Sequence, residues 1–547
     1  MKKILPFLLL FIVSICQAQT KGDSLKLIKD FLRFADLQLN DSEVDSMFDG
    51  VKRNNRLYAD MHKQPIPNSQ PYPLAFSIEK AKDKTKTKNQ WNIPKGINLP
   101  ANKNDLAFYS ITELASLIKY KKISSVELTG FFIARLKKWG DTLQCVINLT
   151  EDIAMREARQ ADEEIKKGNY RGPLHGIPYG LKDLFMVKGT KTTWGAEPYI
   201  DQQSTEDAYV YTQLKNAGAV LCAKLTLGAL AMGDVWHGGK TKTPWDLTKG
   251  SSGSSAGSAS ATVAGLLPFA IGTETLGSII SPSNACGATG LRPTFGSVSR
   301  SGAMVLSWSL DKIGPICRSA KDAAIVFDAI VGTDGKDYGN EPRNFVYNEK
   351  QVDIKKLKVA YVSNYFRTIS KDASPWKVIE QLRALGVTVD SVEFPEKDIY
   401  PANFITPIIN SECAAAFDEL TRSNQDDLLK KQDKGAWPNS FRTARTVPAV
   451  EYINANRHRY SVMTKMNAFM KQFDVLIVPT FSGSQLAITN LSGHPALIFP
   501  CGYSKNGMPE TITLLSNLYD EVKQLVLADA YQKATDHHKK HPALFLE

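Results

Sequence analysis

The sequence predicts an α/β protein with one large, mixed β-sheet that is covered by helices on both faces and preceded by a helical amino-terminal extension. The chain has 547 residues, 43% of them hydrophobic, so it can bury a large core. Short apolar runs of strand length occur in it, such as "KVAYVS" and "FDVLIVPT". Helical segments alternate with such runs, as in "VIEQLRALG" followed by "VTVDSVEF". This alternation is typical of a sheet layered between helices.

The amino terminus has the pattern of a secretory signal peptide over residues 1–18. Two lysines precede an apolar run that ends at Ile15, and Ala18 offers a small residue at the cleavage position. The run is too short to span a bilayer, which takes about 20 apolar residues. We therefore expect an exported protein, periplasmic or secreted and without stable membrane insertion, whose mature chain begins at Gln19. The alternative of a lipoprotein signal at Cys16 fits less well, because a large residue precedes it.

Residues 19–104 are predicted to form a helical extension and a linker strap, and residues 105–547 the main domain. The segment "DSLKLIKDFLRFADLQL" has helical spacing, whereas the stretch that follows is rich in proline and lysine. The formal net charge is +11, and its densest basic run is "KAKDKTKTKNQ". This run has no interleaved aromatic residues, so it indicates a solvated linker rather than a nucleic-acid or membrane surface.

Two capping boxes open the main domain. Ser110 with Glu113, and Ser124 with Glu127, each place a serine before an amphipathic run and a glutamate three residues later. Two consecutive helices are therefore predicted. The least regular stretch is 395–470, whose aromatic and basic residues fit either a cover over a pocket or a surface insertion.

Cysteines and histidines give no sign of a metal site. Of the 7 cysteines, one lies in the signal peptide and most others lie in apolar contexts such as "AVLCAKL", which predicts small buried side chains rather than disulfides. No CxxC pair is present. His537, His538 and His541 lack the ordered spacing of metal ligands, so we expect them at a solvent-exposed end of the last helix.

The glycine-serine run "KGSSGSSAGSASATVAG" has three interpretations. A flexible linker would join two domains, but this run passes directly into an apolar segment. A GxSxG nucleophile elbow would make Ser255 the nucleophile, with His458 or His494 downstream. That elbow follows a buried strand, whereas "KTKTPWDLTKGSS" is polar and interrupted by proline. The third interpretation is a catalytic turn that works together with the later "GTETLGS".

The third interpretation rests on a resemblance to the amidase signature family. It is carried by "GPLHGIPYGLKDLF", "KTPWDLTKGSSGSSAGSASATVAG", "PFAIGTETLGSI", "GATGLRPTFGSVSRSGA", "SLDKIGPICRSAKDAA" and "LSGHPALIFPCGY", in the family's order. The resemblance implies the amidase signature fold and hydrolysis of carbon–nitrogen bonds of linear amides through an acyl-enzyme intermediate, with no metal or organic cofactor. It assigns Ser278 as nucleophile, Ser254 as bridging serine after a cis peptide bond from Gly253, and Lys182 as base.

Elementary chemistry is consistent with this assignment. A serine hydroxyl is a weak nucleophile at neutral pH, so a base must take its proton. A lysine is a base only when neutral, and burial lowers its pKa. Lys182 has apolar neighbours on both sides in "IPYGLKDLFMV", although a surface pair with Asp183 is the alternative. For Ser254 taken alone, the alternative is an ordinary turn serine.

The segment "GTETLGS" also supplies a predicted oxyanion hole. The backbone N–H groups of Thr275, Leu276, Gly277 and Ser278 would stabilise the negative oxygen that develops during acyl transfer. The alternative is a tight glycine turn between a buried strand and the next element.

The resemblance leaves the substrate open. The expected partner is a small-molecule amide or a peptide amide, with no nucleic acid, and neither substrate-binding residues nor the oligomeric state can be assigned. Three other functions are kept: an esterase with the same triad, a glutaminase-type subunit of an amidotransferase, and a catalytically weak binding protein. Two departures from the family pattern motivate the last: Leu276 replaces a small residue, and Ile280 replaces a frequent arginine.

Overall fold

The computed structural model describes residues 20–34, 37–63, 89–349, 351–399 and 402–547. The predicted signal peptide, 1–18, lies outside these ranges, as does much of the predicted strap, 64–88. Among the described residues, no helix is long and apolar enough to cross a membrane.

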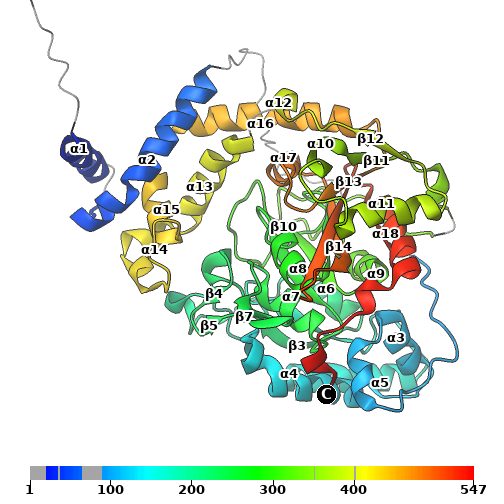
Figure 1. Ribbon diagram of the computed structural model, residues 1–547. Helices are drawn as coiled ribbons and strands as arrows, with labels where there is room; N and C mark the ends of the chain where they lie inside the picture. Colours follow the sequence, from blue (N-terminus) through cyan, green and yellow to red (C-terminus); the bar gives the residue numbers. More distant parts are fainter. Residues whose placement is uncertain (1–19, 35–36, 64–88, 350, 400–401) are drawn as a thin grey trace, which may run out of the picture.

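A mixed sheet of 11 strands runs through the main domain (Figure 1). In spatial order its strands are β1 (Val146–Leu149), β3 (Val220–Leu225), β2 (Pro178–Lys182), β8 (Ala270–Glu274), β10 (Lys312–Cys317), β9 (Thr289–Arg292), β14 (Ala496–Tyr503), β15 (Pro509–Ser516), β13 (Val475–Pro479), β11 (Val359–Val362) and β12 (Val389–Val392). β2 is parallel to β3 and β8, and β11 is parallel to β12 and β13. The other neighbouring pairs are antiparallel. The predicted mixed sheet is confirmed.

The α-helices that surround this sheet come from the whole described chain. They are α1 (Lys21–Phe34), α2 (Asp41–His62), α3 (Ile111–Lys119), α4 (Ser125–Leu143), α5 (Glu151–Lys166), α6 (Tyr209–Asn216), α7 (Ala256–Val263), α8 (Ile280–Cys286), α9 (Ala320–Ile330), α10 (Ser363–Phe366), α11 (Ser374–Ala384), α12 (Glu396–Ile399), α13 (Ile405–Ala416), α14 (Asp418–Arg422), α15 (Trp437–Ala444), α16 (Ala449–Met470), α17 (Gln485–Ser492) and α18 (Glu521–Thr535). Two small two-stranded sheets lie apart from the main one, β4 (Val235–Trp236) with β5 (Gly239–Lys240) and β6 (Lys242–Thr243) with β7 (Asp246–Gly250).

Both faces of the sheet are buried under helices. Along β14, Leu497 and Phe499 belong to one apolar cluster, which includes Leu525 of α18. Their neighbours Ala496 and Ile498 belong to a second cluster, which includes residues of α8, α16 and α17. Because successive side chains of a strand point to opposite faces, the two clusters cover opposite faces of the sheet. The predicted layering is confirmed.

The two predicted capping boxes are present at the starts of α3 and α4. The Ser110 backbone N–H donates to the Glu113 carboxylate at 2.8 Å, and the Glu113 N–H donates to the Ser110 hydroxyl at 3.3 Å. Ser124 and Glu127 form the same reciprocal pair at 2.9 and 3.1 Å. Each box satisfies donors that the first helical turn leaves without an intrahelical partner.

The amino-terminal helices belong to a helical lobe beside the sheet. In Figure 1, α2 lies together with α13, α14 and α15, and it packs against α15. The Arg442 guanidinium on α15 lies 2.7 Å from the Glu43 carboxylate on α2 and 2.8 Å from that of Asp426. The predicted helical extension is therefore confirmed as an integral part of the fold. Most of the described part of 395–470 is helical as well, and within it α16 is in contact with α13, α17 and α2.

The six cysteines from Cys145 onward are buried and free in the described structure, as the apolar contexts of most of them predict. The expectation of solvent-exposed histidines is wrong. After α18 the chain turns back over the domain, and His541 stacks on Phe108 with ring centroids 3.9 Å apart. The Arg135 guanidinium donates to the Phe545 carbonyl at 2.6 Å and so holds this carboxyl-terminal tail against α4. Within the described chain, no group of three or more His, Cys, Asp or Glu residues is arranged to hold a metal ion.

Candidate active site

Lys182 ends β2, an inner strand between β3 and β8, with its side chain fully buried. Its Nζ lies 2.7 Å from the Ser254 hydroxyl, 2.8 Å from the Thr273 hydroxyl and 3.2 Å from the Ser255 hydroxyl. These contacts bring together β2, β8 and the glycine-serine run. Three neutral oxygen atoms therefore surround the amine.

Burial lowers the pKa of Lys182 from its ordinary value of 10.5 to about 7, against the opposing effect of the Asp311 and Glu274 charges. The predicted alternative, a surface pair with Asp183, is wrong. Asp183 instead forms an ion pair with Lys224 of β3, with Nζ and Oδ1 2.8 Å apart and both side chains buried. The Asp183 carboxylate also accepts hydrogen bonds from the Thr193 N–H and hydroxyl, each at 2.7 Å. Its negative charge is thus compensated away from the Lys182 amine.

The glycine-serine run is buried between β7 and α7, which excludes the flexible linker. Ser254 is 1% exposed, and the peptide bond between Gly253 and Ser254 is cis. A Cβ added to Gly253 would lie 1.8 Å from the Gly233 carbonyl oxygen, and one added to Gly257 would lie 2.3 Å from the Cys145 carbonyl oxygen. Glycine is required at both positions because other backbone approaches so closely.

The nucleophile-elbow arrangement is not found around Ser255. The strand before it, β7, pairs with β6 in a small separate sheet, whereas the elbow needs a strand of the central sheet. The Ser255 hydroxyl donates to the Thr273 carbonyl and accepts from the Thr273 N–H, both at 3.1 Å. His494 bonds to the Ser492 hydroxyl at 2.8 Å, and His458 lies on α16 against the ring of Phe404. Ser255 therefore links the run to β8.

Ser278 lies in the turn between β8 and α8 and is 9% exposed. Its carbonyl accepts a hydrogen bond from the Ser255 N–H at 3.1 Å, which joins the two serine-bearing turns through the backbone. The Ser254 and Ser278 hydroxyls form no hydrogen bond with each other among the described residues. Within the described chain, none of the backbone N–H groups of residues 275–278 donates to a protein acceptor. This turn therefore presents a row of consecutive free donors, as an oxyanion hole requires.

Glu274 anchors the start of α8, a role that the sequence did not indicate. Its buried carboxylate accepts from the N–H groups of Ile279 and Ile280 at 2.9 and 3.0 Å. Arg292 and Asn490 donate to its other oxygen, each at 2.9 Å. Burial favours a higher pKa, but the Arg292 and Lys312 charges outweigh it and bring the pKa of Glu274 down to about 2. The turn that carries Ser278 is therefore fixed at its far end by a charged, fully bonded carboxylate.

Asp311 holds the near end of the same turn. Its carboxylate accepts from the Thr275 hydroxyl at 2.6 Å and from the N–H groups of Leu306 and Ser307 at 2.8 and 3.0 Å. Burial raises the pKa of Asp311. Asp311 and Thr273 both lie in segments that carry the family resemblance, but their partners come from elsewhere in the chain and no local pattern distinguished them.

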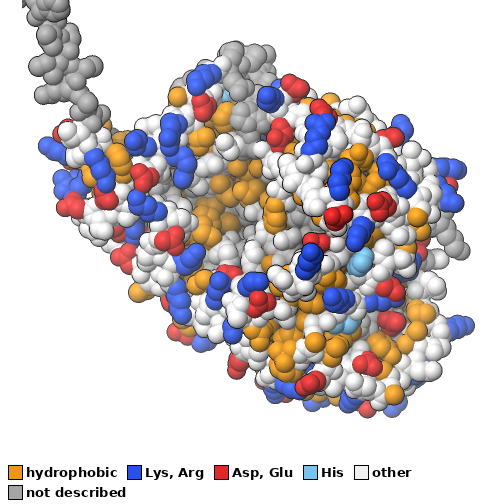
Figure 2. Space-filling view, viewed as in Figure 1, with side chains coloured by type: hydrophobic (Ala, Val, Ile, Leu, Met, Phe, Trp, Pro, Cys, Tyr) orange, Lys and Arg blue, Asp and Glu red, His pale blue; other side chains and the backbone are white. Residues whose placement is uncertain are grey.

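A cavity of about 800 Å³ opens beside the turn. Thr273 and Thr275 of the site line it, together with the segment from Arg300 to Lys312 and side chains of α13 and α16. Figure 2 shows a hollow with apolar side chains on the face where the α2–α13–α15 lobe meets the rest of the protein. Glu412 and Tyr452, from the 395–470 stretch, line this cavity, so part of that stretch lies beside a pocket.

Comparison with known proteins shows the family of this chain. Residues 127–489 match the family model Amidase, and the chain belongs to this family; it is an amide hydrolase that acts on carbon–nitrogen bonds. It is similar to one of the subunits of the glutamyl-tRNA(Gln) amidotransferase of Acinetobacter baumannii, with 31% identity over 486 residues, 80% of this chain and 99% of the relative. The same subunit of the Coxiella burnetii amidotransferase is 32% identical over 485 residues, again 80% of this chain and 99% of the relative.

A solved structure agrees with this placement. The native peptide amidase of Stenotrophomonas maltophilia superposes with a TM-score of 0.70 at 28% identity, covering 79% of this chain and 98% of the other. The amidase signature fold that the resemblance implied is thereby confirmed.

Proposed function

We propose that this chain is an exported amidase that cleaves a carboxylic amide through an acyl-enzyme on Ser278, with Ser254 as proton relay and Lys182 as base. The observation that carries the proposal is the Lys182 amine, fully buried among hydroxyl groups and 2.7 Å from the Ser254 oxygen. A pKa of about 7 leaves a large fraction of this amine neutral at neutral pH. A neutral amine is what the chemistry of a lysine base requires.

The surroundings of Lys182 fit a proton relay. A neutral amine keeps two N–H donors and one lone pair. The hydroxyl oxygens of Thr273 and Ser255 can accept the two N–H groups, and the lone pair then receives the proton of Ser254, the nearest of the three hydroxyls. Ser254 in turn takes the proton of Ser278 as that hydroxyl attacks the carbonyl carbon. The Ser254–Ser278 contact forms when substrate binds, as catalytic hydrogen bonds often tighten only in the substrate complex.

The turn at 275–278 supports the acyl-transfer step. Its free N–H groups would receive the negative charge that develops on the carbonyl oxygen, and loss of one such donor typically costs about 3–4 kcal/mol in the barrier. The relay then returns the proton to the leaving amine, and the carbon–nitrogen bond breaks. Water attacks the ester on Ser278 in the second half-reaction, which releases the acid and restores the serine.

Labelling with a fluorophosphonate tests the nucleophile. We expect a single adduct by intact-mass spectrometry, lost in Ser278→Ala and retained in the matched control Ser255→Ala, whose serine lies in the neighbouring turn. Lys182→Met should slow labelling strongly without removing the site. Labelling that depends on Ser255 instead, or no labelling of a folded protein, would overturn the assignment.

Export and the substrate class belong to the same proposal. The signal peptide pattern at 1–18 supports export, and the likeness to a peptide amidase supports a small-molecule amide or peptide amide as substrate. Fractionation of cells that express the full chain should find a protein outside the cytoplasm whose mass lacks residues 1–18. An intact chain in the cytosol would contradict export.

A second candidate function is that of an amidotransferase component, favoured by the identity of 31% along 99% of such a protein. It predicts protein partners and activity in the cytosol. Affinity purification from the native host, followed by mass spectrometry, separates the candidates: stoichiometric partner proteins would favour the second, and an active chain without partners the first.

The same triad can also attack esters. Comparing kcat/KM for amides with that for matched esters measures how much esterase activity accompanies the amidase activity.

A further inference from the structure

Trp308 is a half-exposed indole on the wall of the 800 Å³ cavity, with 50% of its side chain exposed. Among the described residues, Trp308 and Tyr338 are the exposed large hydrophobic side chains that line this cavity. Tryptophan offers a large, rigid apolar surface and is enriched where one protein surface binds another group. An exposed ring that lines a cavity therefore marks a candidate contact for a ligand.

The backbone on both sides of the ring is held firmly. The Arg300 guanidinium donates to the Trp308 carbonyl at 2.6 Å, and the Arg459 guanidinium on α16 donates to the Ser309 carbonyl at 2.7 Å. The Glu412 carboxylate on α13 accepts from the Ser309 N–H at 3.0 Å and from its hydroxyl at 2.7 Å. Side chains of Arg300, α13 and α16 thus hold the backbone of the segment that carries Trp308, while the ring itself stays half-exposed.

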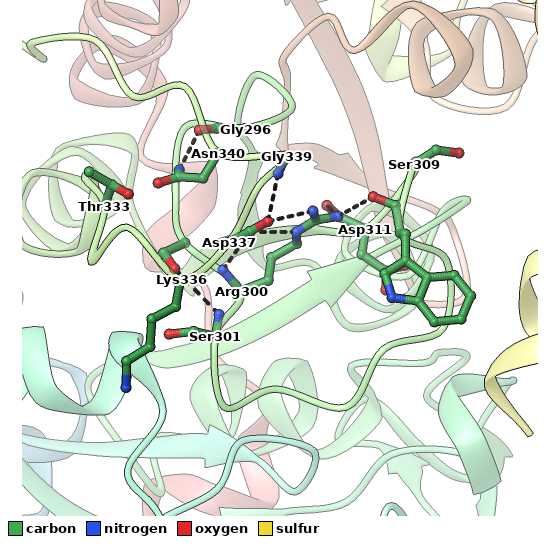
Figure 3. A network of polar contacts seen from close by, with 12 residues as sticks. Gly296, Arg300, Ser301, Ser309, Asp311, Thr333, Lys336, Asp337, Gly339 and Asn340 are labelled. Atoms are coloured by element: carbon green, nitrogen blue, oxygen red, sulfur yellow. Dashed lines mark hydrogen bonds and ion pairs between the residues drawn. The ribbon is translucent and has the colours of Figure 1, made fainter. Parts of the chain in front are cut away.

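The charged groups that bond to the backbone beside Trp308 also have other protein partners. Figure 3 shows Arg300 in a two-pronged ion pair with Asp337, with Nε–Oδ2 and Nη2–Oδ1 distances of 2.8 Å. Glu412 receives hydrogen bonds from Ser307, from Ser309 twice and from Tyr452. Because Arg300, Asp337 and Glu412 have protein partners, the segment that carries Trp308 favours an uncharged group. Lys336 and Glu341 are further charged residues of the cavity wall. Met304, Met463 and Leu518 add apolar surface to the same cavity.

The ring is also coupled to the reacting centre by its own segment of chain. That segment continues to Asp311. The Asp311 carboxylate accepts a 2.6 Å hydrogen bond from the hydroxyl of Thr275, which lies in the turn that carries Ser278. Thr275 and Trp308 line one and the same cavity. A substrate whose carbonyl lies at the turn can therefore reach the ring with another part of its structure.

We propose that Trp308 forms an apolar subsite that binds an aromatic or bulky aliphatic group of the amide substrate and so sets the preference of this enzyme for such amides over small ones. The inference rests on the proposed function, because it places the scissile amide at the Ser278 turn. A bulky group stacked on the indole leaves water together with the ring, which small amides cannot do.

Turnover of a substrate series tests the subsite. The probes are acetamide, hexanamide and phenylacetamide, with ammonia release as the assay. For Trp308→Ala we expect kcat/KM for phenylacetamide and hexanamide to fall about 10- to 100-fold, mainly through KM, while that for acetamide changes less than about 3-fold. Trp308→Phe should retain most of the wild-type kcat/KM for phenylacetamide and hexanamide. Phe481→Ala is the matched control, because Phe481 is 53% exposed but lies outside the cavity wall.

Binding separates failure of the subsite from failure of the proposed function. In the Ser278→Ala protein, calorimetry with phenylacetamide should show binding that Trp308→Ala weakens by the same factor. If no amide is turned over but this binding and its dependence on Trp308 persist, the proposed function fails and the subsite holds. An equal loss for all three amides, or no loss for any in Trp308→Ala, would overturn the subsite.

Discussion

The pH dependence of catalysis follows from the environment of Lys182. Its pKa of about 7 means that half of the amine is neutral at pH 7. About a tenth is then neutral at pH 6 and about a hundredth at pH 5, since each pH unit changes the ratio of the two forms tenfold. An amine at the ordinary lysine pKa of 10.5 would be neutral in only about one molecule in 3,000 at pH 7. Burial therefore raises the fraction of neutral Lys182 amine at pH 7 by a factor of about a thousand.

We expect kcat/KM to rise about tenfold from pH 5 to 6 and about fivefold from pH 6 to 7, and to level off above pH 8. The profile is measured with an uncharged amide, so that the substrate does not titrate, and protein integrity is checked at each pH by circular dichroism. The apparent pKa of kcat/KM reports the free enzyme. A profile that is flat from pH 5 to 10 would refute Lys182 as the base, and a rising limb near pH 10 would refute the lowering of its pKa by burial.

Asp311→Asn sharpens this prediction. The negative charge of Asp311 acts to raise the pKa of Lys182, so its removal should move the rising limb to lower pH. Thr275→Val is the matched control, because it breaks the 2.6 Å hydrogen bond to Asp311 but keeps the charge. We expect the control to lower kcat without moving the limb. Equal displacement of the limb in both variants would show that geometry, not charge, controls the titration.

Three further predictions concern stability and packing. Because the pKa of Lys182 is lower in the folded than in the unfolded chain, the wild type should gain stability as pH rises from 7 to 10.5. In urea titrations, the free energy of unfolding of Lys182→Met should no longer rise with pH over this range. At pH 7 it should exceed that of the wild type by up to about 4 kcal/mol, reduced by the loss of the hydrogen bonds of the amine. Glu274→Gln should lower the free energy of unfolding by about 3–5 kcal/mol at pH 7, because Arg292 is left as an unpaired buried charge. The contribution of the ionised Glu274 carboxylate to stability is present above pH 4.5 and is lost as pH falls toward 2. Gly257→Ala should abolish activity or folding, since its Cβ would lie 2.3 Å from a carbonyl oxygen, whereas Gly130→Ala, where a Cβ meets nothing within 4 Å, should be tolerated in thermal melts.

Local patterns in the sequence were sufficient for much of the architecture. Alternating helical and strand-like runs predict the mixed sheet with two covered faces, and the boxes at Ser110 and Ser124 predict two helix starts, because both signals act within a few residues. The need for glycine at 253 and 257, by contrast, comes from distant backbone, the carbonyl groups of Gly233 and Cys145. Lys182 and Ser278 could be named as candidates through the resemblance of their segments to the amidase signature family, whereas the local pattern around Lys182 also allowed a surface pair with Asp183.

Tertiary structure decided which partners these segments meet. Asp183 follows Lys182 in the chain, yet it lies in the turn after β2 and pairs with Lys224 on the neighbouring strand β3. Asp311 reaches Thr275, and Glu412 reaches the segment beside Trp308, across long sequence separations. The shift in the pKa of Lys182 likewise arises from burial by the whole sheet. Sequence determines which groups are available, whereas their distances, charges and exposure come from packing between distant parts of the chain.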